Sequence, residues 1–305
     1  MPSVTANGIR IEYEEFGDRS GRPLLLIMGL GAQMILWPEE FCELLAARGH
    51  RVIRFDNRDV GKSTWFDQLG VPDVAAAVGA ALMRQPVTAP YLLRDMAADA
   101  AGVLDALRID SAHVVGASMG GMIAQTLAIE FPSRVRTLTS IMSSTGNPDL
   151  PPANPEAMGV LLAPPPTTRD EAIERSVAIF RTIGSPGFPF DEAEMRARAA
   201  RGFDRGFNPA GTVRQLIAIL ASGSRTDALK GLRVPALVIH GKDDPLVPFP
   251  AGQDTAAAIP GAELLAIDGM GHDLPRALWP RFADAISALT ARASAVRARR
   301  ESPAL

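Results

Sequence analysis

Short apolar runs alternate with stretches of helical periodicity along most of the chain. Each run is bounded by polar or turn residues and is too short for a helix, so we expect buried strands. The predicted strands cover residues 24–27, 52–55, 113–115, 135–142, 234–240 and 263–267, and the predicted helices cover residues 37–47, 91–107, 122–130 and 278–290. This alternation predicts an α/β fold, with a mostly parallel central sheet and helices on both of its faces.

The alternation stops near residue 143 and resumes near residue 234. Seven prolines at positions 148, 151, 152, 155, 164, 165 and 166 interrupt it, because such a run cannot continue a helix or a central strand. Helix-like stretches follow over residues 170–182, 191–201 and 213–221. We therefore predict a core of residues 1–145 and 229–290, a helical cap (lid) insertion over residues 146–228, and a frayed tail over residues 291–305.

Composition and charge restrict the class of protein. Hydrophobic residues make up 47% of the 305 residues and charged residues 21%, which is typical of a folded globular chain. A formal net charge of −3 gives no reason to expect nucleic acid or an anionic membrane as a partner. The single cysteine, Cys42, excludes an intramolecular disulfide and a Cys-rich zinc site. Since the chain shows no signal-peptide pattern or long apolar run, we expect a cytoplasmic protein.

The candidate nucleophile lies between a predicted strand and a predicted helix. Gly116-Ala117-Ser118-Met119-Gly120-Gly121 follows the strand 113–115 directly and precedes the helix that begins near Met122. A nucleophile elbow requires this context, because its serine occupies a strained turn and small neighbours prevent backbone collisions. The alternative role for Ser118 is that of a helix N-cap.

A serine hydroxyl needs a base, and the chain has four histidines. His272 lies in a loop directly after the strand 263–267, at the carboxyl edge where open α/β sheets place their ligand crevice, and we predict it as the base. His50 follows Gly49 and is expected to be exposed or to serve a turn. His113 and His240 begin and end predicted strands, so structural roles are expected for both.

The carboxylate that orients the histidine is expected after the strand 234–240. Asp243 and Asp244 both lie there, and adjacent residues in a turn point in different directions, so only one of them reaches His272. We favour Asp244, because the following Pro245 biases its backbone toward an extended turn. Asp243 is then an N-cap or a surface carboxylate.

An oxyanion hole requires two backbone N–H groups that point at the developing negative charge. We predict the N–H of Met119, which follows the elbow serine, and the N–H of Leu30, in the segment Met28-Gly29-Leu30-Gly31 after the first predicted strand. Glycines are expected in that segment, because the backbone must approach the substrate closely. Without the elbow, the segment would be interpreted as a tight turn.

The chain resembles an α/β-hydrolase from end to end, and the order Ser118, Asp244, His272 is the order of that family. Asp56 to Ser63 resembles the family segment D-x-R-G-x-G-x-S, with Asp59 where glycine is usual. This segment ends in Gly-Lys-Ser, but a phosphate-binding loop needs glycine at position 56. Similarity to the aclacinomycin methylesterase group is carried by Leu26-Ile27-Met28-Gly29, Trp37-Pro38, residues 56–63, residues 114–120, Asp244-Pro245 and Gly269-Met270-Gly271-His272.

These residues predict a serine carboxylesterase that acts through an acyl-enzyme on small to medium apolar esters, with methyl esters suggested by the resemblance. Neither a metal nor an organic cofactor is required, and we expect a small-molecule ester as partner and a monomer or homodimer. A lactone, thioester or carbon–carbon bond as substrate, or perhydrolysis, uses the same triad. A binding protein that lost turnover is the alternative of another class. Candidate pocket residues in the cap are Met158, Leu161, Leu162, Phe180, Phe188 and Phe190.

Overall fold

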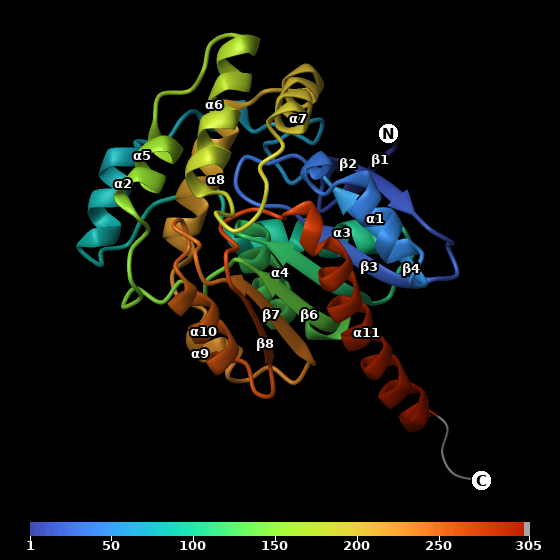
Figure 1. The fold of residues 1–305 in the computed structure, drawn as a ribbon. Helices are drawn as coiled ribbons and strands as arrows, with labels where there is room; N and C mark the ends of the chain where they lie inside the picture. The colour runs from blue at the N-terminus through green and yellow to red at the C-terminus, as the bar shows by residue number, and fades with distance from the viewer. Residues whose placement is uncertain (302–305) are drawn as a thin grey trace.

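The fold is built on one twisted sheet (Figure 1). The computed structural model describes residues 1–301, and within them an eight-stranded sheet has the order β1-β2-β4-β3-β5-β6-β7-β8. All pairs from β4 through β3 to β8 are parallel, so the predicted α/β fold with a mostly parallel sheet is confirmed. The strands are β1 Ser3–Ala6, β2 Ile9–Phe16, β3 Arg22–Ile27, β4 His50–Phe55, β5 Ala112–Ala117, β6 Val135–Ile141, β7 Ala236–Gly241 and β8 Glu263–Ile267.

An antiparallel hairpin at the N-terminus extends the sheet beyond the strands predicted from sequence. β1 pairs with β2, and β2 pairs with β4, both antiparallel. The turn consists of Asn7 and Gly8, which both have positive φ angles, 47° and 76°. Asn-Gly is the preferred pair for a two-residue hairpin turn, because both central positions require that conformation. The sequence does contain the pattern of a β-hairpin here, because the Asn-Gly pair is followed by the alternating apolar residues Ile9, Ile11 and Tyr13.

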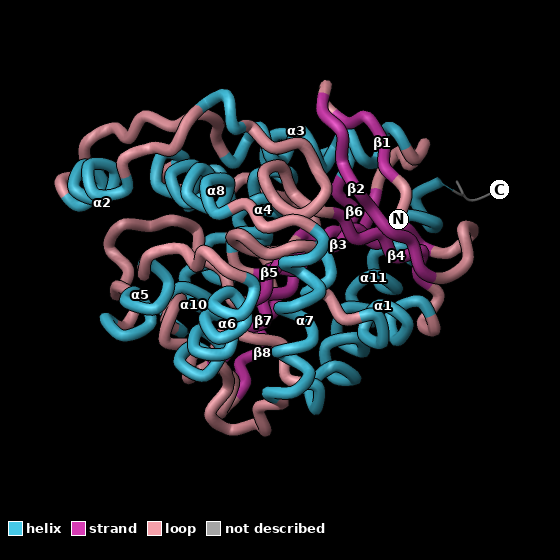
Figure 2. The backbone as a smooth tube through the Cα atoms, turned by 90° about the horizontal axis from the view of Figure 1, so that it is seen from above, coloured by secondary structure: helices cyan, strands magenta, loops and turns pink. Residues whose placement is uncertain are grey.

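Helices cover both faces of the sheet (Figure 2). Neighbouring residues of one strand belong to different apolar clusters: Leu25 faces the side of α3 and α4, and Leu24 and Leu26 face the side of α1 and α11. Burial on both faces explains why the strands read as continuous apolar runs. The helices outside the cap are α1 Glu39–Ala46, α2 Val74–Leu82, α3 Leu93–Ala106, α4 Met119–Glu130, α9 Thr226–Leu229, α10 Phe249–Ala258 and α11 Trp279–Glu301.

The last helix is longer than the sequence analysis predicts. α11 continues past residue 290 to Glu301, where we expected a frayed tail, and residues 302–305 lie outside the described part of the chain. Phe282, Ile286 and Leu289 anchor its first half against the sheet. The extension is rich in alanine and arginine, which have high helix propensity, so it continues the helix without apolar periodicity.

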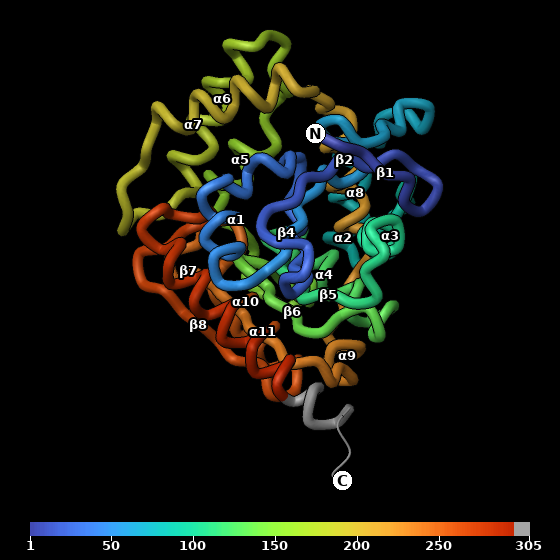
Figure 3. Tube along the Cα trace, turned by 90° about the vertical axis from the view of Figure 1, so that its right-hand side faces the viewer, coloured from blue at the N-terminus to red at the C-terminus, as the bar shows by residue number. Residues whose placement is uncertain are grey.

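Four helices form a cap beyond the carboxyl ends of the parallel strands (Figures 1 and 3). They are α5 Pro155–Leu162, α6 Arg169–Ile183, α7 Glu192–Arg205 and α8 Pro209–Ser222. The last three coincide with predicted helices. α5 was not predicted because the run of prolines indicated a break in the helical pattern, yet Pro155 occupies the first turn, where its missing N–H costs nothing. The Asn154 side chain caps that turn by accepting a hydrogen bond from the Glu156 N–H at 2.8 Å.

A buried ion pair joins the cap to the loop after β4. Asp59, which replaces the glycine usual in the resembled family segment, has a φ of 69° in the left-handed region. Its carboxylate accepts two hydrogen bonds from Arg214 of α8, at 2.7 and 2.9 Å, and one from the Tyr91 hydroxyl at 2.7 Å. Both charged side chains are fully buried. The strained backbone at Asp59 is thus held by partners that a glycine would not engage.

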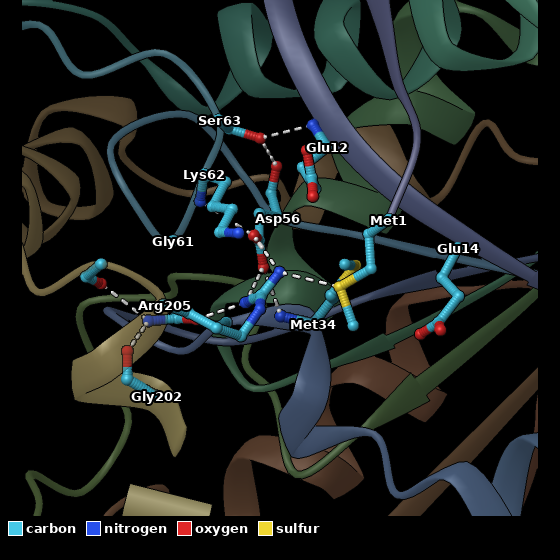
Figure 4. Close-up of polar contacts among 12 residues, drawn as sticks. Met1, Glu12, Glu14, Met34, Asp56, Gly61, Lys62, Ser63, Gly202 and Arg205 are labelled. Carbon is cyan, nitrogen blue, oxygen red and sulfur yellow. Dashed lines mark hydrogen bonds and ion pairs between the residues drawn. The ribbon is translucent and has the colours of Figure 1, made fainter. Parts of the chain in front are cut away.

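A second contact between cap and core is centred on Asp56, at the carboxyl end of β4 (Figure 4). Its carboxylate accepts hydrogen bonds from the backbone N–H groups of Met34 and Lys62, at 2.8 and 3.1 Å, and pairs with Arg205 of α7 at 2.9 Å. A Cβ added to Gly61 would lie 2.2 Å from an oxygen of this carboxylate. The turn from Gly61 to Ser63 therefore encloses the carboxylate of Asp56. A negative group already occupies the position that a phosphate would need, which argues against a phosphate site.

Replacement of Asp59 by asparagine is expected to destabilise the protein. Asparagine tolerates the left-handed backbone, but it leaves the buried Arg214 guanidinium without its buried counter-charge. We expect the free energy of unfolding to fall by about 3 kcal/mol, the lower end for a broken buried pair, because the exposed Asp67 still contacts Arg214 at 2.9 Å. Urea unfolding of Asp59→Asn measures this, and an unchanged midpoint would contradict the role of the pair.

Two histidines are buried at the opposite end of the sheet from the cap. His50, expected to be exposed or in a turn, instead begins β4 and contacts the Leu45 carbonyl and the Thr290 hydroxyl at 2.9 and 2.8 Å. α1 and α11 cover it, which the sequence position beside Gly49 did not indicate. His113 lies in β5 and contacts the Thr137 hydroxyl at 3.0 Å. Burial lowers the pKa of His50, and it lowers the pKa of His113 to about 3.

These lowered pKa values predict a loss of stability in acid. Between pH 3 and pH 6.5 the unfolded chain binds a proton at residue 113 that the folded chain does not, so stability is complete above pH 6.5 and falls below it. From pH 7 to pH 5 this histidine alone removes about 2 kcal/mol of unfolding free energy. Urea titrations at pH 7 and pH 5 should show that His113→Val loses about 2 kcal/mol less unfolding free energy over this interval than the parent protein. Equal losses in the variant and the parent would refute the assignment of the acid sensitivity to His113.

Candidate active site

Ser118 lies at the turn between β5 and α4 in a strained backbone conformation. Its φ and ψ angles are 55° and −124°. The turn is held by hydrogen bonds from the Ser118 N–H to the Ile141 carbonyl, 2.9 Å, and from the Ser143 hydroxyl to the Ser118 carbonyl, 2.8 Å. Although Ser118 has the N-cap position of α4, its side chain makes no capping hydrogen bond. The hydroxyl is therefore available to another partner.

Close backbone packing around the turn explains the glycines of the elbow motif. A Cβ on Gly116 would lie 2.0 Å from the Gly120 carbonyl oxygen, and a Cβ on Gly120 would lie 2.0 Å from that of Ile27. These are distances that no side chain tolerates, so strand, turn and helix approach this closely only with glycine at both positions. The packing holds Ser118 at the carboxyl edge of the sheet.

His272 lies between Ser118 and Asp244. Its Nε2 is 2.9 Å from the Ser118 Oγ, and its Nδ1 is 2.7 Å from an Asp244 carboxylate oxygen. A carboxylate only accepts hydrogen bonds, so the neutral imidazole donates from Nδ1 and leaves Nε2 to accept from the serine hydroxyl. The structure thus brings together the three side chains that the sequence analysis selected from three distant loops.

The two neighbouring aspartates have different surroundings. Asp244 is buried, and its second oxygen accepts hydrogen bonds from the N–H groups of Leu246 and Val247, at 2.9 and 2.8 Å. Asp243 is exposed, and its carboxylate accepts a hydrogen bond from the Gly269 N–H at 2.7 Å. Asp243 therefore joins the loop after β7 to the loop that carries His272, and does not contact the imidazole.

His240 is close to Asp244 but makes no hydrogen bond to Ser118. It is buried at the end of β7, where its Nε2 is 2.8 Å from the Val247 carbonyl and 3.7 Å from an Asp244 oxygen. Burial lowers the pKa of His240, which favours its neutral form. It packs behind Asp244, in agreement with the structural role expected for it.

The two amides predicted for the oxyanion hole flank Ser118. Met119 is the first residue of α4, where a backbone N–H has no carbonyl of its own helix to bond. On the other side, a Cβ on Gly29 would lie 3.1 Å from the Ser118 Cβ, so the segment of Leu30 passes directly beside the serine. Within residues 1–301, the Leu30 N–H makes no hydrogen bond. The Met119 N–H likewise has no hydrogen-bond partner in the described chain.

The cap contacts the loop of His272 through the connection between α6 and α7. The His272 N–H donates to the Ile183 carbonyl at 2.7 Å, and the Gly271 N–H donates to the Ser185 hydroxyl at 2.9 Å. Ser185 also hydrogen-bonds Asp273, whose pKa is raised by burial. No sequence motif marks Ser185 and Asp273, because only the packing of the cap makes them neighbours.

A cavity of about 640 Å³ extends between the cap and the candidate oxyanion loop. It begins at Leu30 and Gly31 and is lined by one face each of α6, α7 and α8, most of it apolar. Three of the six predicted cap residues line it: Leu161, Leu162 and Phe180. Met158 does not, Phe188 packs against the core, and Phe190 is exposed. The helical register, unknown from sequence, decides which apolar residues face the cavity.

Residues 1–301 contain no group of three or more His, Cys, Asp or Glu side chains arranged to hold a metal ion. Cys42 is buried in the apolar cluster that contains Phe41 and Leu45, and burial raises the pKa of its thiol to about 12, so it remains a neutral thiol. No helix in this part of the chain is both long and apolar enough to cross a bilayer. The contact of Ser118 with His272 places a hydroxyl beside an imidazole nitrogen.

Comparison with known proteins gives the family of the chain. Residues 22–275 match the model of the α/β-hydrolase fold family. The rhodomycin D methylesterase DauP of Streptomyces sp. (strain C5) is 35% identical over 95% of this chain and 98% of its own length, and DnrP of Streptomyces peucetius, also a rhodomycin D methylesterase, is 34% identical over the same shares.

Solved structures have the same fold. The meta-cleavage product hydrolase CumD of Pseudomonas fluorescens IP01 superposes with a TM-score of 0.74 over 96% of this chain and 98% of its own, at 21% identity. The elbow, the parallel sheet and the family match agree, and the chain belongs to the α/β-hydrolase fold family.

Proposed function

We propose that this protein is a serine carboxylesterase with Ser118 as nucleophile, His272 as base and Asp244 as the orienting carboxylate. Its family and its methylesterase relatives make it a carboxylic ester hydrolase. The finer assignment rests on one observation, the continuous hydrogen-bonded series from Ser118 Oγ through His272 to Asp244, at 2.9 and 2.7 Å. A neutral serine is a poor nucleophile, and a base at this distance removes its proton as it attacks.

The geometry supports a two-step reaction. His272 Nε2 accepts the Ser118 proton while Oγ attacks the ester carbonyl, and the Leu30 and Met119 amides bind the oxyanion. The imidazolium, stabilised by Asp244, then protonates the leaving alcohol, which departs and leaves an acyl-enzyme. Water, deprotonated by His272, attacks the acyl-enzyme and releases the acid and the serine.

We infer that the substrates are small to medium apolar carboxylic esters, methyl esters among them. The two Streptomyces relatives are methylesterases, and the lining of the cavity between cap and core suits an apolar acyl part. The cavity volume favours the larger members of this class. The substrate is a small molecule; a cytoplasmic location and a monomeric or homodimeric state remain predictions.

Removal of the Ser118 hydroxyl is expected to abolish ester hydrolysis without unfolding the protein. Ser118→Ala should lower p-nitrophenyl butyrate turnover by at least about 10³-fold and prevent labelling by a fluorophosphonate. Its thermal unfolding should match the parent protein, since the hydroxyl makes no capping bond. Retention of more than a few per cent activity in a pure sample would refute the nucleophile.

Asparagine substitutions at the two neighbouring aspartates form a matched pair. Asp244→Asn should lower kcat by about 10³- to 10⁴-fold, because an amide stabilises neither the required tautomer nor the imidazolium. Asp243→Asn keeps an oxygen that accepts from Gly269 and should change kcat by only a few-fold. Steady-state kinetics of both variants decide the assignment, and a larger loss at position 243 would reverse it.

A further inference from the structure

Gln215 of α8 contacts the loop that carries the Leu30 amide. Its side chain is fully buried. The Oε1 accepts a hydrogen bond from the Gly31 N–H at 2.8 Å, and the Nε2 donates to the Arg58 carbonyl at 2.7 Å. One glutamine of the cap thus bridges the candidate oxyanion loop and the turn after β4. The triad chemistry does not use this side chain, and the sequence analysis did not identify it.

The Gln33 side chain of the loop from Met28 to Met34 reaches the cap, where it donates to the carbonyls of Gly202 and Gly206, both at 2.7 Å. The backbone of this loop has two further side-chain anchors, and both come from the core. Asn57 Nδ2 donates to the Met28 carbonyl at 2.9 Å, and Asp56 accepts from the Met34 N–H at 2.8 Å. These anchors hold the two ends of the loop, and Gln215 holds its middle. It does so at Gly31, which has a φ of 64° and packs so closely on α8 that a Cβ there would lie 2.7 Å from the Thr212 hydroxyl.

The position of this hydrogen bond determines which amide remains free. Gly31 and Leu30 present consecutive N–H groups, and either one could turn toward a substrate oxygen in a mobile loop. Gln215 occupies the Gly31 donor, so of these two N–H groups the one without a partner in the described chain is that of Leu30. The Leu30 N–H lies in the preceding peptide, whose Gly29 carbonyl accepts from the Ala32 N–H at 3.2 Å. By holding the adjoining Leu30–Gly31 peptide, Gln215 limits the rotation of Leu30 and with it the direction of the Leu30 N–H. A preorganised donor stabilises an oxyanion better than one that must first reorient.

We propose that Gln215 is a positioning residue for the oxyanion hole, by which the cap holds the Leu30 amide in its productive direction. The inference rests on the proposed esterase function and adds a residue outside the triad and the two donors. Loss of the Gln215 side chain should affect the transition state, in which the oxygen is charged, more than the bound ester. The expected signature is therefore a lower kcat with little change in KM.

Two substitutions separate hydrogen bonding from packing. Gln215→Met keeps a similar volume but removes both hydrogen bonds. Gln215→Glu keeps the shape, and its protonated form still accepts from Gly31 and donates to the Arg58 carbonyl. The ionised form places a negative oxygen against that carbonyl. The charged neighbours are already paired, Arg58 with Asp99 and Arg214 with Asp59, so burial should raise the pKa of the new carboxyl.

A matched control is available in Gln125. It is also a fully buried glutamine with two side-chain partners, Ser140 at 3.3 Å and Arg225 at 3.1 Å, but it does not contact the candidate oxyanion loop. Gln125→Met reports the effect of losing buried hydrogen bonds without touching Gly31. Thermal unfolding of all three variants shows which of them are folded at the assay temperature.

The experiment measures kcat and KM for p-nitrophenyl butyrate from pH 6 to pH 9. Gln215→Met should lower kcat by about 10- to 100-fold at every pH, with KM within about threefold, as expected for a misdirected donor. Gln125→Met should change kcat by less than about threefold. In Gln215→Glu, the protonated side chain keeps both hydrogen bonds, whereas the ionised side chain loses the one to the Arg58 carbonyl. The ratio of the kcat of this variant to the kcat of the parent protein should therefore fall at least about tenfold as pH rises.

The outcomes separate the two levels of the proposal. An active parent protein whose kcat falls equally in Gln215→Met and Gln125→Met, or a Gln215→Glu ratio independent of pH, overturns the positioning role alone. A parent protein without turnover or fluorophosphonate labelling overturns the esterase function, and the role of Gln215 with it. Should Gln215→Met fail to fold, the pH dependence of Gln215→Glu decides by itself.

Discussion

The left-handed backbone at Ser118 is the constraint on which the site depends. A non-glycine residue adopts this conformation at a cost, and only surrounding structure holds it there. Here α4 packs so closely on β5 at Gly116 and on β3 at Gly120 that neither position has space for a side chain. Ile141 of β6 and Ser143 in the loop after it bond the turn on both sides. The packing of the whole sheet edge therefore maintains the strained backbone at Ser118. The Ser118 hydroxyl lies within hydrogen-bond distance of His272 as a result.

Buried polar contacts make the cap and the core one structure around this edge. Asp59 pairs with Arg214, Asp56 pairs with Arg205, and Gln215 reaches the loop beside Ser118. Each buried partner would be costly to leave unpaired, so these contacts select one arrangement of the cap over others that bury similar apolar area. The cavity between cap and core lies next to the candidate oxyanion loop, at Leu30 and Gly31.

Prediction from sequence succeeded where short-range rules apply. Apolar runs located β3 to β8, and the elbow motif with its flanking strand and helix located Ser118. Asp244 and His272 followed because carboxyl ends of parallel strands meet at one edge. The N-terminal hairpin was missed although its Asn-Gly turn is a local signal. The burial of His50 and the extent of α11 were misjudged, because the first depends on neighbours distant in the chain and the second on helix propensity without periodicity.

The amino-acid sequence by itself determined the α/β architecture, the strained serine turn and the loops in which a base and a carboxylate follow strands. It determined these because they depend on periodicity, on glycine and on the geometry that all parallel sheets share. The sequence favoured Asp244 over Asp243 through the following Pro245, and the tertiary structure places Asp244 against His272. Only the tertiary structure decided which cap residues line the cavity and that Gln215 meets Gly31. Such contacts depend on side-chain direction and helical register across distant segments, which no local pattern specifies.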